Sequence, residues 1–177
     1  MLDDVKITET DTHSGAEDRN LCIACLEGKQ SRTYNKEPSP RATRPLELLH
    51  SDSCGPFETL SIAKYKYFII FVDDDTHYVW VFFLRTKSSE EILQVFRQFK
   101  ALVEKSTGLS IARFRCDNGK GEYDNHQFKY FLAESGISFE PSAPYNQDQN
   151  GVSERMIRMI IEKARTMLHD AGLPYCF

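Results

Sequence analysis

The stretch YFIIFVDDDTHYVWVFFL, residues 67–84, contains two apolar runs on either side of a polar segment. Tyr67–Val72 is continuously apolar, as expected for a strand buried on both faces. Tyr78–Leu84 is rich in β-branched and aromatic residues, which favour strands. Asp73, Asp74 and Asp75 lie between the two runs and are predicted to form a solvated turn. Together they predict an antiparallel hairpin.

The segments on either side of this hairpin alternate between strand and helix patterns. A helix is predicted after a Ser88 or Ser89 cap, and Gly108 is predicted to end it. The other expected elements are strands at Leu46–Asp52, Leu109–Cys116 and Ile137–Glu140, and helices at Asn125–Ser135 and Val152–Ala171. The buried side of the last helix is expected to carry Val152, Met156, Met159, Ile160, Ala164, Met167 and Leu168. The order predicts an α/β domain with a mixed sheet.

Composition limits the class of protein. The chain has 177 residues, 41% of them hydrophobic and 27% charged, which is typical of a globular domain. Its apolar runs are far shorter than the roughly 18 residues of a membrane span, so no membrane partner is expected. Five cysteines, an odd number, favour a reducing, intracellular location. The net charge of −4, taken alone, argues against a general nucleic-acid-binding surface.

Composition also changes along the chain. Residues 1–45 are polar, with Pro38, Pro40 and Pro45 near their end, and are predicted to form an appendage and linker. Residues 46–177 are richer in apolar residues and are predicted to supply the core.

Three acidic residues fall near the ends of predicted elements: Asp52, Asp117 and Glu154. Asp52 and Asp117 close predicted strands, and Glu154 lies in the first turn of the last helix. Taken alone, Asp52 and Asp117 are better explained as turn residues, and Glu154 as a favourable acid at a helix start. Carboxylates that converge from different elements are also what divalent ions such as Mg²⁺ require for phosphoryl chemistry.

The residues around these acids carry a resemblance. Motifs occur in a fixed order at Leu48–Pro56, Tyr67–Asp74, Arg115–Gly119, Gly121–Tyr123, Ala143–Tyr145, Gln149–Arg155, Ala164–Leu168 and Gly172–Pro174. Over about residues 21–177, the chain resembles the integrases of copia-type LTR retrotransposons, within the retroviral-type catalytic cores. The resemblance implies an RNase H-like fold with a mixed five-stranded sheet flanked by helices. It also implies that Asp52, Asp117 and Glu154 form a D,D,E triad that binds Mg²⁺ or Mn²⁺.

The same resemblance implies an activity. A polynucleotidyl transferase of this kind trims the 3′ ends of element DNA and joins them to target DNA, in the nucleus or a cytoplasmic virus-like particle. Joining two DNA ends implies a homo-oligomer. Two alternatives remain open. One is a ribonuclease H or exonuclease of the same fold, which the order of motifs disfavours. The other is a decayed or domesticated fragment that binds nucleic acid without catalysis.

Cys22 and Cys25 have the spacing of metal ligands. In the family that the chain resembles, such a pair closes an N-terminal His-His-Cys-Cys zinc module. His13 is the only upstream histidine in this sequence, so residues 1–45 are expected to hold a truncated module. Zn²⁺ is therefore expected only if that module is completed. Two free thiols are the alternative interpretation.

Basic residues suggest DNA contacts at two places. Lys29 and Arg32 lie in a basic stretch before the core, and Arg155 and Arg158 lie beside Glu154 on the last helix. Both pairs are candidates for binding DNA phosphates. The alternatives are a solvated linker for the first pair, and ion pairs with neighbours such as Glu162 for the second.

Overall fold

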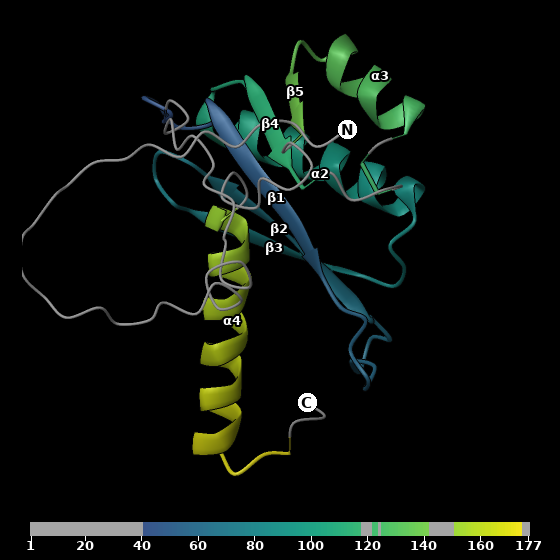
Figure 1. Ribbon diagram of the computed structural model, residues 1–177, viewed down its shortest axis with the longest axis vertical. Coiled ribbons are helices and arrows are strands. Elements are labelled where there is room, and N and C mark those ends of the chain that lie inside the picture. The colour runs from purple at the N-terminus through teal and green to yellow at the C-terminus, as the bar shows by residue number, and fades with distance from the viewer. Residues whose placement is uncertain (1–40, 118–121, 124, 142–150, 175–177) are drawn as a thin grey trace, which may run out of the picture. The chain divides into compact units, whose positions relative to one another are not determined.

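The computed structural model describes residues 41–117, 122–123, 125–141 and 151–174. In these ranges a five-stranded sheet is flanked by helices, as predicted (Figure 1). The strands are β1 Leu48–Cys54, β2 Tyr67–Asp73, β3 Val79–Leu84, β4 Arg113–Cys116 and β5 Ser138–Pro141. The helices are α2 Ser89–Thr107, α3 His126–Glu134 and α4 Gly151–Asp170. None of the helices in the described part is long and apolar enough to span a membrane.

The sheet has the order β3-β2-β1-β4-β5 and mixes two kinds of pairing. β1 pairs antiparallel with β2, and β2 with β3, which confirms the hairpin. β1 pairs parallel with β4, and β4 with β5. The sheet is therefore mixed, and β1 lies at its centre between an antiparallel and a parallel neighbour.

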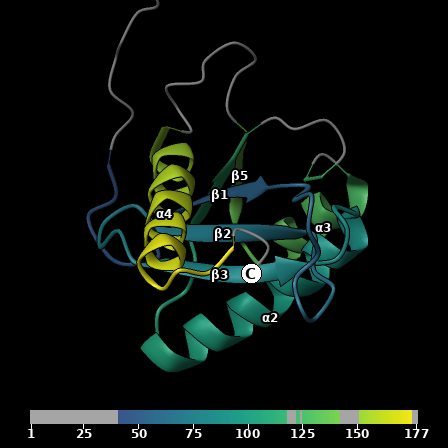
Figure 2. The same ribbon diagram turned by 90° about the horizontal axis from the view of Figure 1, so that it is seen from below.

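Side chains from the two faces of the sheet enter two separate cores. On one face, Phe71 of β2 and Phe114 of β4 pack with the buried sides of α2 and α3. Phe71 stacks on Phe99 of α2 with ring centroids 4.3 Å apart. On the other face, β2 packs against the first half of α4. Figure 2 shows α4 apart from α2 and α3, as this division requires.

The ends of α2 follow the predicted chemistry. The Ser88 side chain accepts a hydrogen bond from the Glu91 backbone N–H and so caps the helix start. Gly108 ends the helix in the left-handed conformation, which glycine adopts without steric cost. The predicted apolar positions Phe96 and Phe99 are fully buried. Helical periodicity was therefore sufficient to orient this helix.

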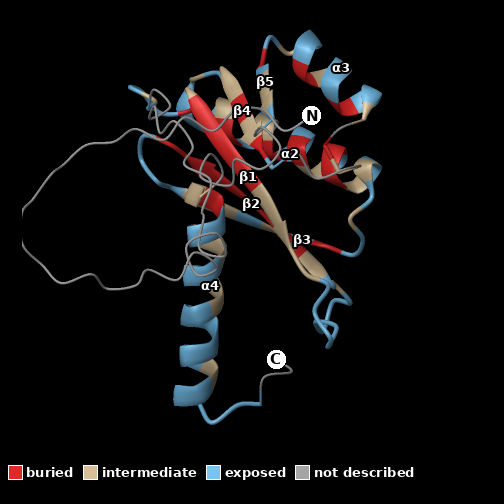
Figure 3. Cartoon of the chain, in the orientation of Figure 1, coloured by how far each residue is buried: buried red, intermediate tan, exposed pale blue. Residues whose placement is uncertain are grey.

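The prediction for the buried side of α4 was wrong at some positions. Its buried contacts come from Val152, Met156, Ile157, Ile160 and Ile161. Met159 is 37% and Met167 66% exposed, although both were expected to be buried. Figure 3 shows the C-terminal part of α4 mostly exposed, and in Figure 1 it extends beyond the sheet. The apolar stripe continues past the point where the sheet can cover it.

Some strand boundaries also differ from the predicted ones. β4 begins at Arg113 rather than at Leu109, and β1 continues to Cys54 rather than ending at Asp52. The predicted domain boundary at residues 45 and 46 stays a prediction, because residues 1–40 lie outside the described part.

Candidate functional site

Asp52 lies on β1, and Asp117 directly follows the parallel neighbour β4. Ser51 of β1 pairs with Cys116 of β4, and the two aspartates are the next residues along their strands. Asp52 pairs across to Ile70, which belongs to the core beneath α4. Cross-strand partners share a face of the sheet, so Asp52 lies on the face that α4 covers.

Glu154 approaches the same face from the helix. It lies in the first turn of α4, as predicted, and is exposed. Ser153 beside it is fully buried, and Val152 packs against β2, so the start of α4 is fixed on the sheet. An acid in a first helical turn also benefits from the partial positive charge of the helix start.

The charges of these acids act on one another. The pKa of Asp52 is raised from 3.8 to about 6, first by burial and then by the negative charges of Asp117 and Glu154. The Ser53 backbone N–H, which donates to Asp52 Oδ1 at 2.7 Å, and the positive charge of Lys87 both act to lower this pKa. Asp117 and Glu154 therefore both lie within electrostatic reach of Asp52.

The three carboxylates interact without forming a tight cluster. Among the described residues, no three His, Cys, Asp or Glu side chains are close enough to hold a metal ion together. Neighbouring carboxylates repel when ionised, and a divalent cation relieves this repulsion. The donor set of Asp52, Asp117 and Glu154, all carboxylate oxygens, is the kind that Mg²⁺ binds. The donor chemistry of these residues therefore fits such an ion, although the described structure does not gather the three side chains around one point.

The segment Asp73-Asp74-Asp75 was predicted to be a solvated turn, and for its first two residues this was wrong. Asp73 and Asp74 are 1% and 7% exposed, and only Asp75 is exposed. Asp73 accepts a 2.7 Å hydrogen bond from the backbone N–H of Leu46, and Asp74 accepts one of 2.8 Å from Ala42. These carboxylates therefore hold the chain segment that leads into β1.

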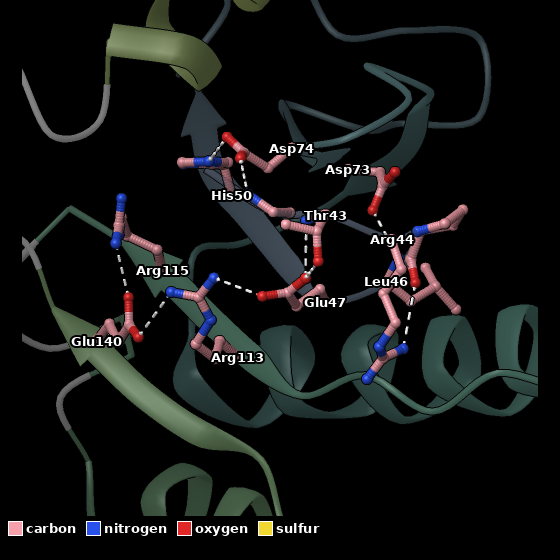
Figure 4. Close-up of polar contacts among 12 residues, drawn as sticks. Thr43, Arg44, Leu46, Glu47, His50, Asp73, Asp74, Arg113, Arg115 and Glu140 are labelled. Atoms are coloured by element: carbon pink, nitrogen blue, oxygen red, sulfur yellow. Dashed lines mark hydrogen bonds and ion pairs between the residues drawn. The ribbon is translucent and has the colours of Figure 1, made fainter. Parts of the chain in front are cut away.

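Asp74 also binds the buried His50. His50 Nε2 donates to Asp74 Oδ1 at 2.8 Å (Figure 4). Burial lowers the pKa of His50, and the Asp74 carboxylate only partly offsets this, so the neutral imidazole is favoured. His50 pairs with Val72 and lies two residues before Asp52, on the same face of β1. The pair fixes the part of β1 that presents Asp52.

A second polar group beside Asp52 was not predicted. Ser53 Oγ donates to Glu122 Oε2 at 2.7 Å, and Lys87 Nζ lies 3.2 Å from Glu122 Oε1. The three residues come from β1, the β3–α2 loop and the β4–α3 loop. Ser51 shares a buried 2.8 Å hydrogen bond with Tyr123, next to Glu122. The sequence offers one sign of this group, the Gly121–Tyr123 motif, but none that links it to Lys87.

The predicted DNA-binding residues divide into two groups. Arg155 and Arg158 are exposed on α4 and follow Glu154 along the helix. Lys29, Arg32, Cys22 and Cys25 lie outside the described residues. Two other arginines of the sheet are engaged in ion pairs. Arg115 lies 2.7 Å and Arg113 3.4 Å from Glu140 of β5, and Figure 4 shows this group beside β1.

The chain is also similar in sequence to known proteins. Residues 42–147 match the family described as the integrase core domain. The chain is 44% identical over 156 residues to the retrovirus-related Pol polyprotein from transposon TNT 1-94 of Nicotiana tabacum. It is 37% identical over 153 residues to that from transposon RE1 of Arabidopsis thaliana. These matches cover 88% and 86% of this chain, but only 12% and 10% of the relatives.

Solved structures share the fold. A chain in the simian T-cell lymphotropic virus intasome, in complex with PP2A regulatory subunit B56 gamma, matches with a TM-score of 0.67 and 18% identity. The match covers 86% of this chain and 52% of that one. The HTLV-2 integrase catalytic core domain, in complex with magnesium in its dimeric form, matches with a TM-score of 0.57 and 21% identity, covering 76% and 81%. The RNase H-like fold is thereby confirmed, and the chain belongs to the integrase core domain family.

Proposed function

We propose that this chain is the catalytic core of a retrotransposon integrase, which trims the 3′ ends of element DNA and joins them to target DNA. The observation that supports the proposal is the electrostatic interaction of Asp52 with Asp117 and with Glu154, whose charges both raise the pKa of Asp52. Asp52 lies on β1, Asp117 directly follows the parallel neighbour β4, and Glu154 lies in the first turn of the helix that packs over the Asp52 face. The similarity to transposon Pol polyproteins supports the same function.

In this proposal, Asp52, Asp117 and Glu154 hold the divalent ions through carboxylate oxygens. Such ions, Mg²⁺ or Mn²⁺, activate the attacking oxygen and stabilise the leaving oxygen of an in-line displacement at phosphorus. The chain contributes a rigid support: β1 is held by the His50–Asp74 pair, and Ser53 donates its N–H to Asp52. A carboxylate with fixed orientation loses less entropy when it binds an ion.

We further propose that DNA lies along the exposed side of α4 and that the active form is an oligomer. Arg155 and Arg158 are exposed next to Glu154 and would contact phosphates. The solved structures that share this fold include an intasome and a dimeric catalytic core, which supports assembly on DNA. A net charge of −4 is compatible with this partner, because bound cations would offset the acids of the site.

The test is a nicking and strand-transfer assay with labelled DNA in Mg²⁺ or Mn²⁺. Glu154→Gln should lose at least about a hundredfold in rate, because it removes a charged ligand. Glu162→Gln is the matched control, since Glu162 is an exposed acid further along the same helix. If Glu154→Gln retains full activity, the assignment of Glu154 is wrong. If the unaltered chain binds DNA but never cuts it, the alternative of a noncatalytic nucleic-acid-binding fragment is favoured.

A further inference from the structure

Lys87 is a cation at the edge of the acidic site. It lies in the loop between β3 and α2, and its side chain is 29% exposed. Its positive charge acts to lower the pKa of both Asp52 and Cys54, which places it within electrostatic reach of the end of β1. The loop itself is well anchored, because Glu91 accepts hydrogen bonds from the backbone N–H groups of Arg85 and Thr86.

Two contacts hold the Lys87 side chain. Its Nζ lies 3.2 Å from Glu122 Oε1 and 5.7 Å from the centre of the Tyr67 ring. The other oxygen of Glu122 accepts the 2.7 Å hydrogen bond from Ser53, the residue after Asp52. The lysine is thus connected to the strand that carries Asp52 through a single carboxylate.

An ammonium group has three N–H donors, and one carboxylate oxygen at 3.2 Å uses only one of them. A lysine side chain that is 29% exposed therefore retains N–H donors for an anion. The site beside it carries three carboxylates, which repel a polyanion such as DNA. A fixed cation at the rim reduces this repulsion where a phosphate of the substrate must approach.

We propose that Lys87 binds a phosphate of the DNA substrate beside the acidic site, and that Glu122 is the positioning residue that orients its ammonium group. This inference rests on the proposed function, because it takes DNA to be the substrate. Lys87 would be a phosphate contact in addition to those proposed on α4, and its loop is remote in sequence from all three acids.

The experiment measures binding of a fluorescent DNA duplex at several salt concentrations and the metal-dependent nicking rate, for the full 177-residue chain. Lys87→Gln should lower the slope of log affinity against log salt by about 0.9, the value for one phosphate contact. Its KM for DNA should rise on the order of tenfold. Lys87→Arg should bring both the salt slope and the KM close to the values of the unaltered chain, since arginine keeps the positive charge. Glu122→Gln should raise KM while leaving the salt slope near the unaltered value.

Lys100→Gln is the matched control, because Lys100 is a partly buried lysine paired with Glu104 at 2.7 Å on α2. It should leave the salt slope and KM unchanged. Thermal unfolding of each variant separates a folding defect from a binding defect, and Lys87→Arg tests the charge if Lys87→Gln unfolds. If the unaltered chain binds and cuts DNA, and Lys87→Gln has the same salt slope and the same KM, the inference about Lys87 is wrong. The proposed function is not affected by that result. An unaltered chain that neither binds nor cuts DNA overturns the proposed function as well.

Discussion

Asp52 and Asp117 each directly follow one member of the Ser51–Cys116 pair, on adjacent parallel strands. Parallel pairing brings equivalent ends of strands to the same edge of a sheet, so residues far apart in sequence carry their charges side by side. The charges of Asp117 and Glu154 both raise the pKa of Asp52. Repulsion of this kind lowers the stability of the fold and is characteristic of functional sites.

Because Asp117 and Glu154 repel the charge of Asp52, removing that charge should raise the stability of the fold. Asp52→Asn, in the presence of a chelator, should raise the free energy of unfolding by about 1–2 kcal/mol, because it removes a half-buried charge that two acids repel. Added Mg²⁺ should stabilise the unaltered chain but not the variant. Urea unfolding with and without Mg²⁺ measures both effects. Equal stabilisation of the two proteins by Mg²⁺ would show that the ion binds elsewhere.

Asp74 should contribute to stability far more than its neighbour. Asp74→Asn weakens the hydrogen bonds to His50 and Ala42 and should cost about 2 kcal/mol. Asp75→Asn, an exposed control in the same turn, should change stability by less than about 0.5 kcal/mol. Urea unfolding at neutral pH compares the two, and equal effects would contradict the buried role of Asp74.

The difference caused by Asp74→Asn should also depend on pH. Burial acts to raise the pKa of Asp74, but hydrogen bonds from Ala42 and His50 outweigh it, so the pKa lies below its ordinary value. A lowered carboxyl pKa gives stability that is present above the unfolded value of about 3.9 and lost as the pH falls through the folded one. The unaltered chain and the variant should therefore converge in stability under acid. A gap that widens on acidification would reverse the assigned sign.

Gly55 should tolerate no side chain. A Cβ there would lie 2.7 Å from Tyr67 Cδ1 and 2.8 Å from the Lys66 carbonyl oxygen, at φ +126°. Gly55→Ala should cost about 2–4 kcal/mol through this overlap and the backbone strain. Gly136→Ala, at φ +71° with open space around it, should cost only about 1–2 kcal/mol. Thermal unfolding of both variants checks the difference, and similar losses would mean that the overlap is relieved.

The two halves of α4 should respond differently when a methionine side chain is replaced by alanine. Met156→Ala removes a contact with the core of the sheet and should cost about 1–2 kcal/mol. Met167→Ala, at a residue 66% exposed, should change stability by less than about 0.5 kcal/mol. Urea unfolding separates them. A large loss at Met167 would indicate that another surface covers this part of the helix in solution.

Local features of the sequence were sufficient for most of the fold. The Ser88 cap and the apolar positions of α2 depend on neighbours within one or two helical turns, so periodicity and capping rules could find them. The same periodicity could not show where the sheet stops covering α4, and Met159 and Met167 were wrongly expected to be buried. How much of a helix is covered depends on the length of its partner, which a helical pattern does not contain.

Some residues of the candidate site could likewise be predicted from the sequence, and others could not. Asp52, Asp117 and Glu154 were predicted from their motifs, whereas the burial of Asp73 and Asp74 depends on the segment at residues 42–46, about 30 positions away. Lys87 and Glu122 are separated by β4 and α2, and no spacing rule connects them. Polar groups whose partners come from distant elements could be recognised only once the chain was folded.

The most direct test of the central claim is a crystal structure of this chain with Mn²⁺, whose anomalous scattering locates the ion. If Asp52, Asp117 and Glu154 form a metal site, a peak should lie about 2.0–2.3 Å from carboxylate oxygens of Asp52 and Asp117, with Glu154 directed toward it. Asp52→Asn should abolish the peak under the same conditions. A peak bound only to other residues, or none at saturating Mn²⁺, would contradict the account.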